Sequence, residues 1–189
     1  QSALILGDNI FYGSRLPALL QKASCNQHGA TIFGYHVNDP ERYGIIEFSS
    51  GERIGKLIEK PKNSSSNYAI TGLYFLDENA TNYAKMLKPS SRGELEIIDL
   101  LEIYRKNDEL TYEKLSRGYA WLDTGTVSSL LDASNYVRTL TERQGLQIGS
   151  PDEVAYLMGL INSEALRKNA ENFKSSQYGQ YLTKLANEP

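Results

Sequence analysis

The sequence predicts an α/β protein with a helical C-terminal segment. Apolar runs of strand length alternate with segments of helical periodicity up to about residue 145. Beyond that point only helical patterns follow, in short pieces, to about Leu185. With 40% hydrophobic and 23% charged residues, the 189-residue chain has an ordinary globular composition and can bury a substantial core. We therefore expect two parts, an α/β part over 1–145 and a helical part over 146–189.

The first elements follow from short apolar runs and the spacing of leucines. The continuous apolar run at 2–6 favours a central, parallel strand covered on both faces. Helical spacing at 14–24 and a second apolar run at 30–37 complete a βαβ unit with a right-handed crossover. Turn residues fill 38–44, and two strands around a Ser-Ser-Gly turn are expected within 45–61.

The middle of the chain continues the alternation. Branched and aromatic residues favour a strand at 68–77, and a helix is expected near 78–86. The segment 93–107 places apolar side chains on one helical face and acidic residues early, where the helix dipole favours them. Alternating polarity predicts an edge-type strand at 110–116.

The last third begins with another apolar run that ends on an aspartate and a glycine turn, at 118–126. Thr126 is a suitable N-cap for a helix that Gly145 would end. A new helix is expected after Ser150, because Pro151 and Glu153 complete the pattern of a capping box.

Composition excludes several classes of protein. The net charge of −3 provides no basic field for a nucleic-acid backbone. Cys25 is the only cysteine, which favours a reducing cytoplasm, and no apolar run is long enough to span a membrane. His28 and His36 lack the spacing of metal ligands. The sequence also lacks a Walker lysine loop, a dinucleotide-binding glycine motif and a nucleophile elbow.

Two aspartates follow predicted strands and are candidate metal ligands. Asp8 comes after the first apolar run, and Asp123 ends the run before the later glycine turn. Loops at the carboxyl ends of strands often hold the chemistry of an α/β sheet, and paired carboxylates suit Mg²⁺ that also binds phosphates. The alternative is that Asp-Asn and Asp-Thr-Gly only form turns.

Charged residues elsewhere have two interpretations. Lys60 could bind a phosphate as a point charge while Glu59 accepts hydrogen bonds from hydroxyls, or the two could form a solvated pair before Pro61. The Arg-Tyr-Gly at 42–44 is equally ambiguous. Arg92 could bind a phosphate through two hydrogen bonds, or pair with a nearby glutamate at a helix start.

A resemblance to a known family adds to this interpretation. The chain resembles the bacterial glucose-1-phosphate thymidylyltransferases, also called dTDP-glucose pyrophosphorylases, over essentially its whole length. The residues that carry the resemblance occur in the expected order as LILGDNIFYG, GYHVNDPERYGIIEF, IEKP, NYAITGLYFLD, KPSSRGELEIIDL, RGYAWLDTGT and ERQGL.

The resemblance implies a fold and an activity. The fold would be a Rossmann-like nucleotide-diphospho-sugar transferase fold with a mixed sheet. The activity would join dTTP and α-D-glucose 1-phosphate into dTDP-glucose with release of pyrophosphate and with Mg²⁺ as cofactor. It would belong to the dTDP-L-rhamnose pathway, in a cytoplasmic homotetramer subject to feedback by dTDP-rhamnose.

The resemblance also implies roles for individual residues. Asp8 and Asp123 would hold the metal, and Lys60 would act with them in catalysis. Glu59 would bind sugar hydroxyls, whereas Lys60 and Arg92 would bind the sugar's phosphate. The sugar-phosphate pocket as a whole would comprise Tyr43, Gly44, Glu59, Lys60, Ile70, Tyr74 and Arg92. A regulatory nucleotide site would include Tyr12, Gly13, Arg117 and Gly118.

One departure from the family is large. The glycine-rich G-x-G-T-R-L-x-P segment, which holds the nucleotide in that family, has no match here. By comparison the chain lacks about a hundred N-terminal residues that would supply central strands of the sheet, so we expect it to be inactive alone. Two alternatives remain: a nucleotide-sugar binding or regulatory domain without catalysis, and a metal-dependent glycosyltransferase, although the usual D-x-D pair is absent around Asp8.

Overall fold

The computed structural model describes residues 1–90 and 93–188, and its contacts divide the chain into two compact units. The units are Gln1–Gly125 and Thr126–Pro189. The sequence predicts a division after residue 145. The observed division comes earlier because helix α4 (Val127–Gln144) groups with the later helices.

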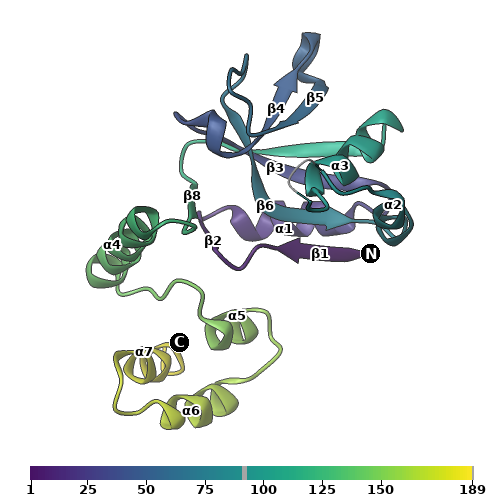
Figure 1. Ribbon diagram of the computed structural model, residues 1–189. Coiled ribbons are helices and arrows are strands. Elements are labelled where there is room, and N and C mark those ends of the chain that lie inside the picture. Colours follow the sequence, from purple (N-terminus) through teal and green to yellow (C-terminus); the bar gives the residue numbers. More distant parts are fainter. Residues whose placement is uncertain (91–92, 189) are drawn as a thin grey trace. The chain divides into compact units, whose positions relative to one another are not determined.

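A mixed sheet forms the centre of the first unit (Figure 1). Its main path runs in the order β5-β4-β6-β3-β7, and β1 pairs with β6 beside this path. Among the strand pairs of the described residues in this sheet, the β3–β7 pair is parallel and the others are antiparallel. The strands are β1 (Ser2–Ile5), β3 (Ala30–His36), β4 (Gly44–Phe48), β5 (Ile54–Glu59), β6 (Tyr68–Leu76) and β7 (Leu110–Leu115).

Helices cover both faces of this sheet. Helix α1 (Leu16–Cys25) packs on one face, where Leu73 of β6 is buried. Helices α2 (Ala80–Met86) and α3 (Ile97–Lys106) belong to the cluster on the other face, where Tyr74 is buried. Neighbouring residues of β6 thus enter different clusters, as the alternation of side chains along a strand requires.

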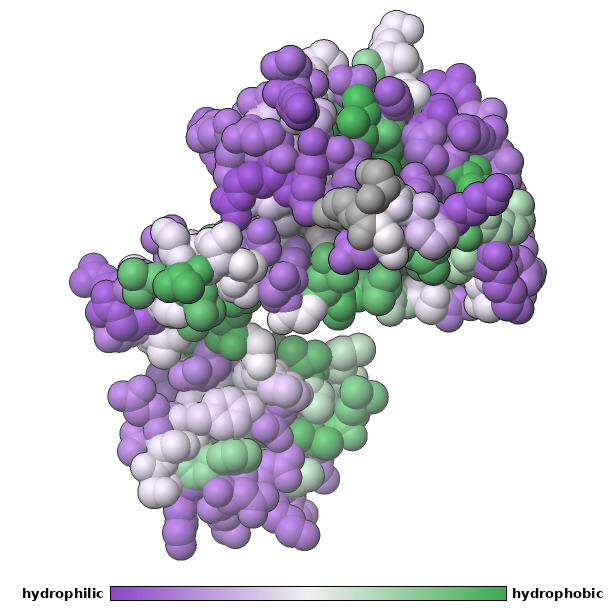
Figure 2. All heavy atoms as spheres, in the orientation of Figure 1, coloured by the Kyte–Doolittle hydropathy of each residue, from purple (hydrophilic) through white to green (hydrophobic). Residues whose placement is uncertain are grey.

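The first strand differs from the prediction. β1 is antiparallel to β6, and β6 lies between β1 and β3, so the predicted βαβ pair is not adjacent. Leu4 is 41% and Ile5 57% exposed, and Figure 2 shows hydrophobic surface along this edge. An apolar run shows that a strand can be buried on both faces, but it does not specify which segments cover it. Among the described residues none covers this strand fully.

A second, two-stranded sheet was not predicted. β2 (Asn9–Tyr12) pairs antiparallel with β8 (Ala120–Asp123). The register sets Asn9 opposite Asp123. This short ribbon therefore brings together two segments that are far apart in the sequence.

The remaining predictions for the first unit hold closely. β4 and β5 form the expected antiparallel hairpin, with the one-turn helix η2 (Ser50–Glu52) between them. A second such turn, η1 (Pro40–Arg42), lies in the predicted turn region. Helix α3 begins at Ile97 rather than at 93.

The second unit consists of helices, as predicted for the C-terminal part: α4, α5 (Pro151–Leu157), α6 (Ser163–Asn172) and α7 (Gln177–Leu185). Thr126 caps α4 through the backbone N–H of Ser129, and Gly145 ends α4 in the left-handed conformation. Ser150 caps α5. The small core of this unit contains Leu166, Ala170, Leu182 and Ala186. No helix within the described residues is long and apolar enough to cross a membrane.

Candidate active site

The aspartates Asp8 and Asp123 lie close together. The β2–β8 ribbon aligns their segments, and Thr124 donates two hydrogen bonds to the backbone carbonyl of Asp8, from its N–H at 2.8 Å and its hydroxyl at 2.9 Å. A Cβ atom on Gly125 would lie 3.2 Å from Asp123 Oδ1 and 3.7 Å from Asp8 Oδ2. Both carboxylates therefore border the same small volume, which the absence of a side chain at Gly125 leaves open.

The route by which they meet differs from the prediction. Sequence reasoning placed both acids at the carboxyl ends of strands in one parallel sheet. In the structure Asp8 lies in the turn between β1 and β2, and Asp123 ends β8 in an antiparallel pair. The branched and aromatic residues Ile10, Phe11 and Tyr12 were the available signal for this ribbon.

The two carboxylates suit Mg²⁺ only if waters or a phosphate-bearing substrate supply its other ligands. Within the described ranges there is no group of three or more His, Cys, Asp or Glu side chains that could hold a metal ion. Mg²⁺, however, is usually bound by one or two carboxylates, with waters and substrate phosphates completing its shell. The exposed position of Asp8 leaves room for such a ligand.

A guanidinium group lies beside this pair of acids. Arg42 Nη2 is 3.7 Å from Asp123 Oδ2, and Arg42 Nη1 donates to Asp39 Oδ2 at 2.9 Å. The hydrogen bond to Asp39 is the main cause of the raised pKa of Arg42. Its guanidinium carbon is 5.2 Å from the centre of the Tyr43 ring. Arg42 therefore places a fixed positive charge at the rim of the candidate metal site.

Two aromatic rings pack against each other next to Arg42 and the carboxylate pair. The rings of Tyr43 and Trp121 have centroids 5.0 Å apart at an interplanar angle of 59°. Trp121 is only 8% exposed, and its Nε1 donates to Asn9 Oδ1 at 2.6 Å. Burial raises the pKa of Tyr43. Tyr43 thus connects the carboxylate pair to the next strand, β4.

The predicted sugar-phosphate residues adjoin this aromatic pair. Gly44 is paired with Glu59 across the β4–β5 hairpin, and a Cβ on Gly44 would lie 2.6 Å from Ile98 Cδ1. Lys60 donates its backbone N–H to Tyr43 at 3.0 Å, and its Nζ is 3.7 Å from Glu59 Oε1. Lys60 has a positive φ of 42°, which is strained for a residue other than glycine. The strained backbone at Lys60 fixes the direction in which the chain leaves the hairpin.

Two other predicted pocket residues are buried. Ile70 is 6% and Tyr74 3% exposed, and both belong to the hydrophobic cluster under α3. Burial, with a smaller effect from the Glu59 carboxylate, raises the pKa of Tyr74. Tyr74 is therefore close to Glu59 and forms part of the wall behind it. Arg92, the remaining predicted phosphate ligand, lies outside the described residues.

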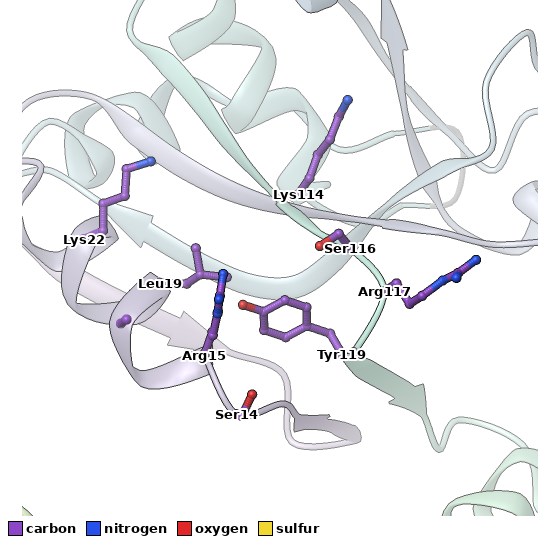
Figure 3. Close-up of a pocket in the computed structure, with 10 residues that line it drawn as sticks. Ser14, Arg15, Leu19, Lys22, Lys114, Ser116, Arg117 and Tyr119 are labelled. Atoms are coloured by element: carbon purple, nitrogen blue, oxygen red, sulfur yellow. The ribbon is translucent and has the colours of Figure 1, made fainter.

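Two of the four residues predicted for a regulatory site line a separate cavity (Figure 3). Arg117 and Gly118 line this cavity of about 480 Å³, together with Arg15 and Tyr119. Gly13 packs directly against the Tyr119 ring, which leaves no space for a side chain there. Tyr12 ends β2 next to it. Among the other lining residues, Lys22 pairs with Glu113 and Lys114 with Glu52.

Known proteins similar to this chain agree in family. A glucose-1-phosphate thymidylyltransferase of Xanthomonas campestris is 51% identical over 185 residues, which cover 98% of this chain and 63% of that protein. One from Mycobacterium tuberculosis is 48% identical over 97% of this chain and 63% of its own length. The chain thus spans 63% of the length of these curated relatives.

Solved structures show the same fold. A structure from Bacillus anthracis, named provisionally as a glucose-1-phosphate thymidylyltransferase and solved with sucrose, matches with a TM-score of 0.63 and 42% identity over 72% of this chain and 54% of that chain. A UDP-glucose pyrophosphorylase matches in fold, with a TM-score of 0.60 at 24% identity, over 72% of this chain and 54% of that one. The family model described as nucleotidyl transferase covers residues 1–139, and the chain belongs to this family.

Proposed function

We propose that this chain is part of a nucleotidyltransferase that joins dTTP and α-D-glucose 1-phosphate into dTDP-glucose and releases pyrophosphate. The observation that carries the proposal is the convergence of Asp8 and Asp123 on one volume at Gly125. Two neighbouring carboxylates suit a reaction between two phosphate groups, because a cation bound by them would offset the negative charge of the phosphate oxygens. The similarity to curated thymidylyltransferases over 98% of the chain supports the choice of substrates.

The reaction is an in-line displacement at phosphorus. A phosphate oxygen of glucose 1-phosphate attacks the α-phosphorus of dTTP as the bond to the pyrophosphate oxygen breaks, so no covalent enzyme intermediate is needed. The protein's task is to align two polyanions and to stabilise the charge that develops on the phosphoryl oxygens. Mg²⁺, when bound by Asp8 and Asp123, would supply that stabilisation.

The chain's own residues would hold the sugar phosphate. Lys60 would bind its phosphate as a point charge, and Glu59 would accept hydrogen bonds from sugar hydroxyls. Arg92 would bind the same phosphate, and Gly44, where a side chain would collide with Ile98, would let the hairpin pack closely next to Glu59. Lys60 Nζ and Glu59 Oε1 form a partly exposed pair at 3.7 Å, which a bound sugar phosphate would have to separate in order to meet both groups.

Further parts of the proposal rest on similarity and on the cavity beside Arg117. The pathway would be that of dTDP-L-rhamnose in the cytoplasm, and the complete protein would be a homotetramer. Feedback by dTDP-rhamnose would act at Tyr12, Gly13, Arg117 and Gly118. Arg15 and Arg117 line this cavity, and arginine side chains suit the diphosphate of a nucleotide sugar.

The substrates are tested with the protein carrying every residue encoded before Gln1. We expect pyrophosphate release that requires dTTP, glucose 1-phosphate and Mg²⁺ together. Hydrolysis or transfer from a nucleotide sugar without pyrophosphate release would instead indicate a glycosyltransferase. Calorimetric binding of glucose 1-phosphate without turnover would indicate a binding domain.

The 189-residue chain is tested separately in the same assay. We expect no pyrophosphate release above a metal-free control, because the segment that holds the nucleotide in the family has no match in this sequence. Turnover by this chain alone would show that its own residues suffice to bind the nucleotide.

A further inference from the structure

Asn9 connects three parts of the first unit through its side chain. Its Oδ1 accepts hydrogen bonds from Trp121 Nε1 at 2.6 Å and from the backbone N–H of Gly72 at 3.0 Å. Its Nδ2 donates to Asp8 Oδ1 at 2.9 Å. The partners come from β8, from β6 and from the turn before β2, so one carboxamide links both sheets to the candidate metal ligand.

The orientation of this carboxamide is determined by its partners. The indole and the backbone amide can only donate, so both must face the amide oxygen. The NH₂ group then necessarily faces Asp8, whose carboxylate can accept. A reversed carboxamide would set donor against donor twice, at a position next to the buried Trp121.

The space around Asn9 is equally constrained. A Cβ on Gly72 would lie 2.7 Å from Asn9 Oδ1 and 2.8 Å from Leu6 Cδ1. Only glycine at position 72 therefore lets the carboxamide reach the backbone of β6. This close approach holds Asn9 in place from the side opposite to Asp8.

The two oxygens of Asp8 have different environments as a result. Oδ1 accepts the hydrogen bond from Asn9, whereas Oδ2 is the oxygen that lies 3.7 Å from a Cβ position on Gly125. The hydrogen bond thus fixes one oxygen and directs the other toward Asp123. Outer contacts of this kind orient metal ligands and set their affinity.

We propose that Asn9 is a positioning residue for Asp8 and couples the state of this carboxylate to Trp121. The inference rests on the proposed function where it takes Asp8 as a metal ligand. The coupling runs through hydrogen bonds at both ends of the Asn9 carboxamide. A shift of the Asp8 carboxylate would move this carboxamide, and with it the oxygen that accepts the hydrogen bond from the indole of Trp121. Trp121 is the single tryptophan of the chain, so its fluorescence reports this link directly.

The link is tested first without metal, by a double-mutant cycle read from Trp121 emission. We expect Asp8→Asn to shift the emission when Asn9 is present, and the shift to fall by at least half in the Asn9→Ala background. An emission unaffected by Asp8→Asn, or affected equally in both backgrounds, would overturn the proposal. Far-UV circular dichroism checks that each variant is folded.

The second test measures binding of Mg²⁺ alone by calorimetry. We expect Asn9→Ala to weaken binding about tenfold. Gly72→Ala should weaken it in the same direction while keeping every polar group, which covers the case in which Asn9→Ala does not fold. Gly34→Ala is the matched control, because its Cβ would meet Ile46 Cδ1 at 3.2 Å on another strand of the same sheet, away from Asn9.

The two tests separate this inference from the proposed function. Folded Asn9→Ala and Gly72→Ala variants that bind Mg²⁺ as tightly as the unchanged protein would overturn the positioning role. If the unchanged protein binds no Mg²⁺, the metal assignment fails, and the metal-free cycle alone decides whether Asn9 couples Asp8 to Trp121.

Discussion

Two aspartates of the first unit, Asp77 and Asp8, differ in burial and in hydrogen bonding. Asp77, at the end of β6, is only 6% exposed and accepts hydrogen bonds on both oxygens. Its donors are the Tyr104 hydroxyl at 2.7 Å, the Gly29 backbone at 2.9 Å and the Asn79 backbone and side chain at 2.9 and 3.1 Å. Asp8 is exposed, and of its two carboxylate oxygens Oδ1 holds the hydrogen bond from Asn9.

The difference separates a structural acid from one suited to a ligand. Asp77 uses its lone pairs within the protein, which ties the start of α2 to β3 and α3. Asp8 keeps an oxygen directed at the volume beside Gly125, where Asp123 also lies. We therefore expect changes at Asp8 to alter catalysis and changes at Asp77 to alter stability.

The largest expected effect is that of Asp8→Ala on turnover. In the complete enzyme we expect a loss of about 10³-fold in kcat, because a ligand of the charge-stabilising cation is lost. Its free energy of unfolding should change by less than about 0.5 kcal/mol, since the side chain is exposed. Pyrophosphate release and urea denaturation measure the two quantities. Near-normal turnover would remove Asp8 from the metal site.

Asp77→Ala should have the reverse profile. Removing this carboxylate leaves the Tyr104 hydroxyl and the Gly29 N–H without their partner in a buried position, which costs about 3 kcal/mol of stability. Glu142→Ala is the matched control, because Glu142 is an exposed acid paired with Arg138 at the surface. Urea denaturation of the two variants checks the contrast, which equal destabilisation would refute.

The pH dependence of stability sharpens the same contrast. Burial alone would raise the pKa of Asp77, but hydrogen bonds from Tyr104, Gly29 and Asn79 outweigh it and lower the pKa. A lowered pKa in the folded state means that the stabilisation is complete above the unfolded value of about 3.9 and is lost as the pH falls through the folded pKa.

We therefore expect the stability difference between the unchanged protein and Asp77→Asn to shrink when the pH falls from about 5 toward 2. Urea denaturation across this range measures it. A difference that stays constant with pH would show that the carboxylate charge contributes nothing to the role of Asp77.

The smallest expected effect concerns the charge beside Asp123. Arg42 competes with a cation for Asp123 Oδ2, from which its Nη2 is 3.7 Å away. Arg42→Gln should therefore tighten Mg²⁺ binding by about two- to fivefold, the range expected for a partly exposed ion pair. Calorimetry with Arg53→Gln as the control measures the change. Weaker binding would show that Arg42 supports the metal site instead of competing with it.

Much of the fold was predictable because its signals are local. The caps Thr126 and Ser150 and the glycine end of α4 depend on residues within one helical turn. The β4–β5 hairpin follows from one turn between two apolar runs. The buried strand β3 and the helix α1 follow from periodicity along a single segment.

The prediction for β1 was wrong for a different reason. Its composition is that of a covered strand, yet Ile5 is 57% exposed and the strand is antiparallel to β6. Residue type reports what environment a side chain favours, whereas partners and direction depend on segments distant in the chain. The missed ribbon of β2 and β8 has the same cause, because each strand is short and acquires its order from the other.

The sequence by itself determined the α/β class, the limits of most elements and the two acids that are candidates for metal binding. Only the tertiary structure decided that those acids meet through an antiparallel ribbon, that Arg42 lies beside them, and that Asn9 joins Asp8 to Trp121, which lies 112 positions after Asn9 in the chain. Helical periodicity and caps act within a few residues. Contacts between distant segments depend on how strands pair and pack, which no single segment encodes.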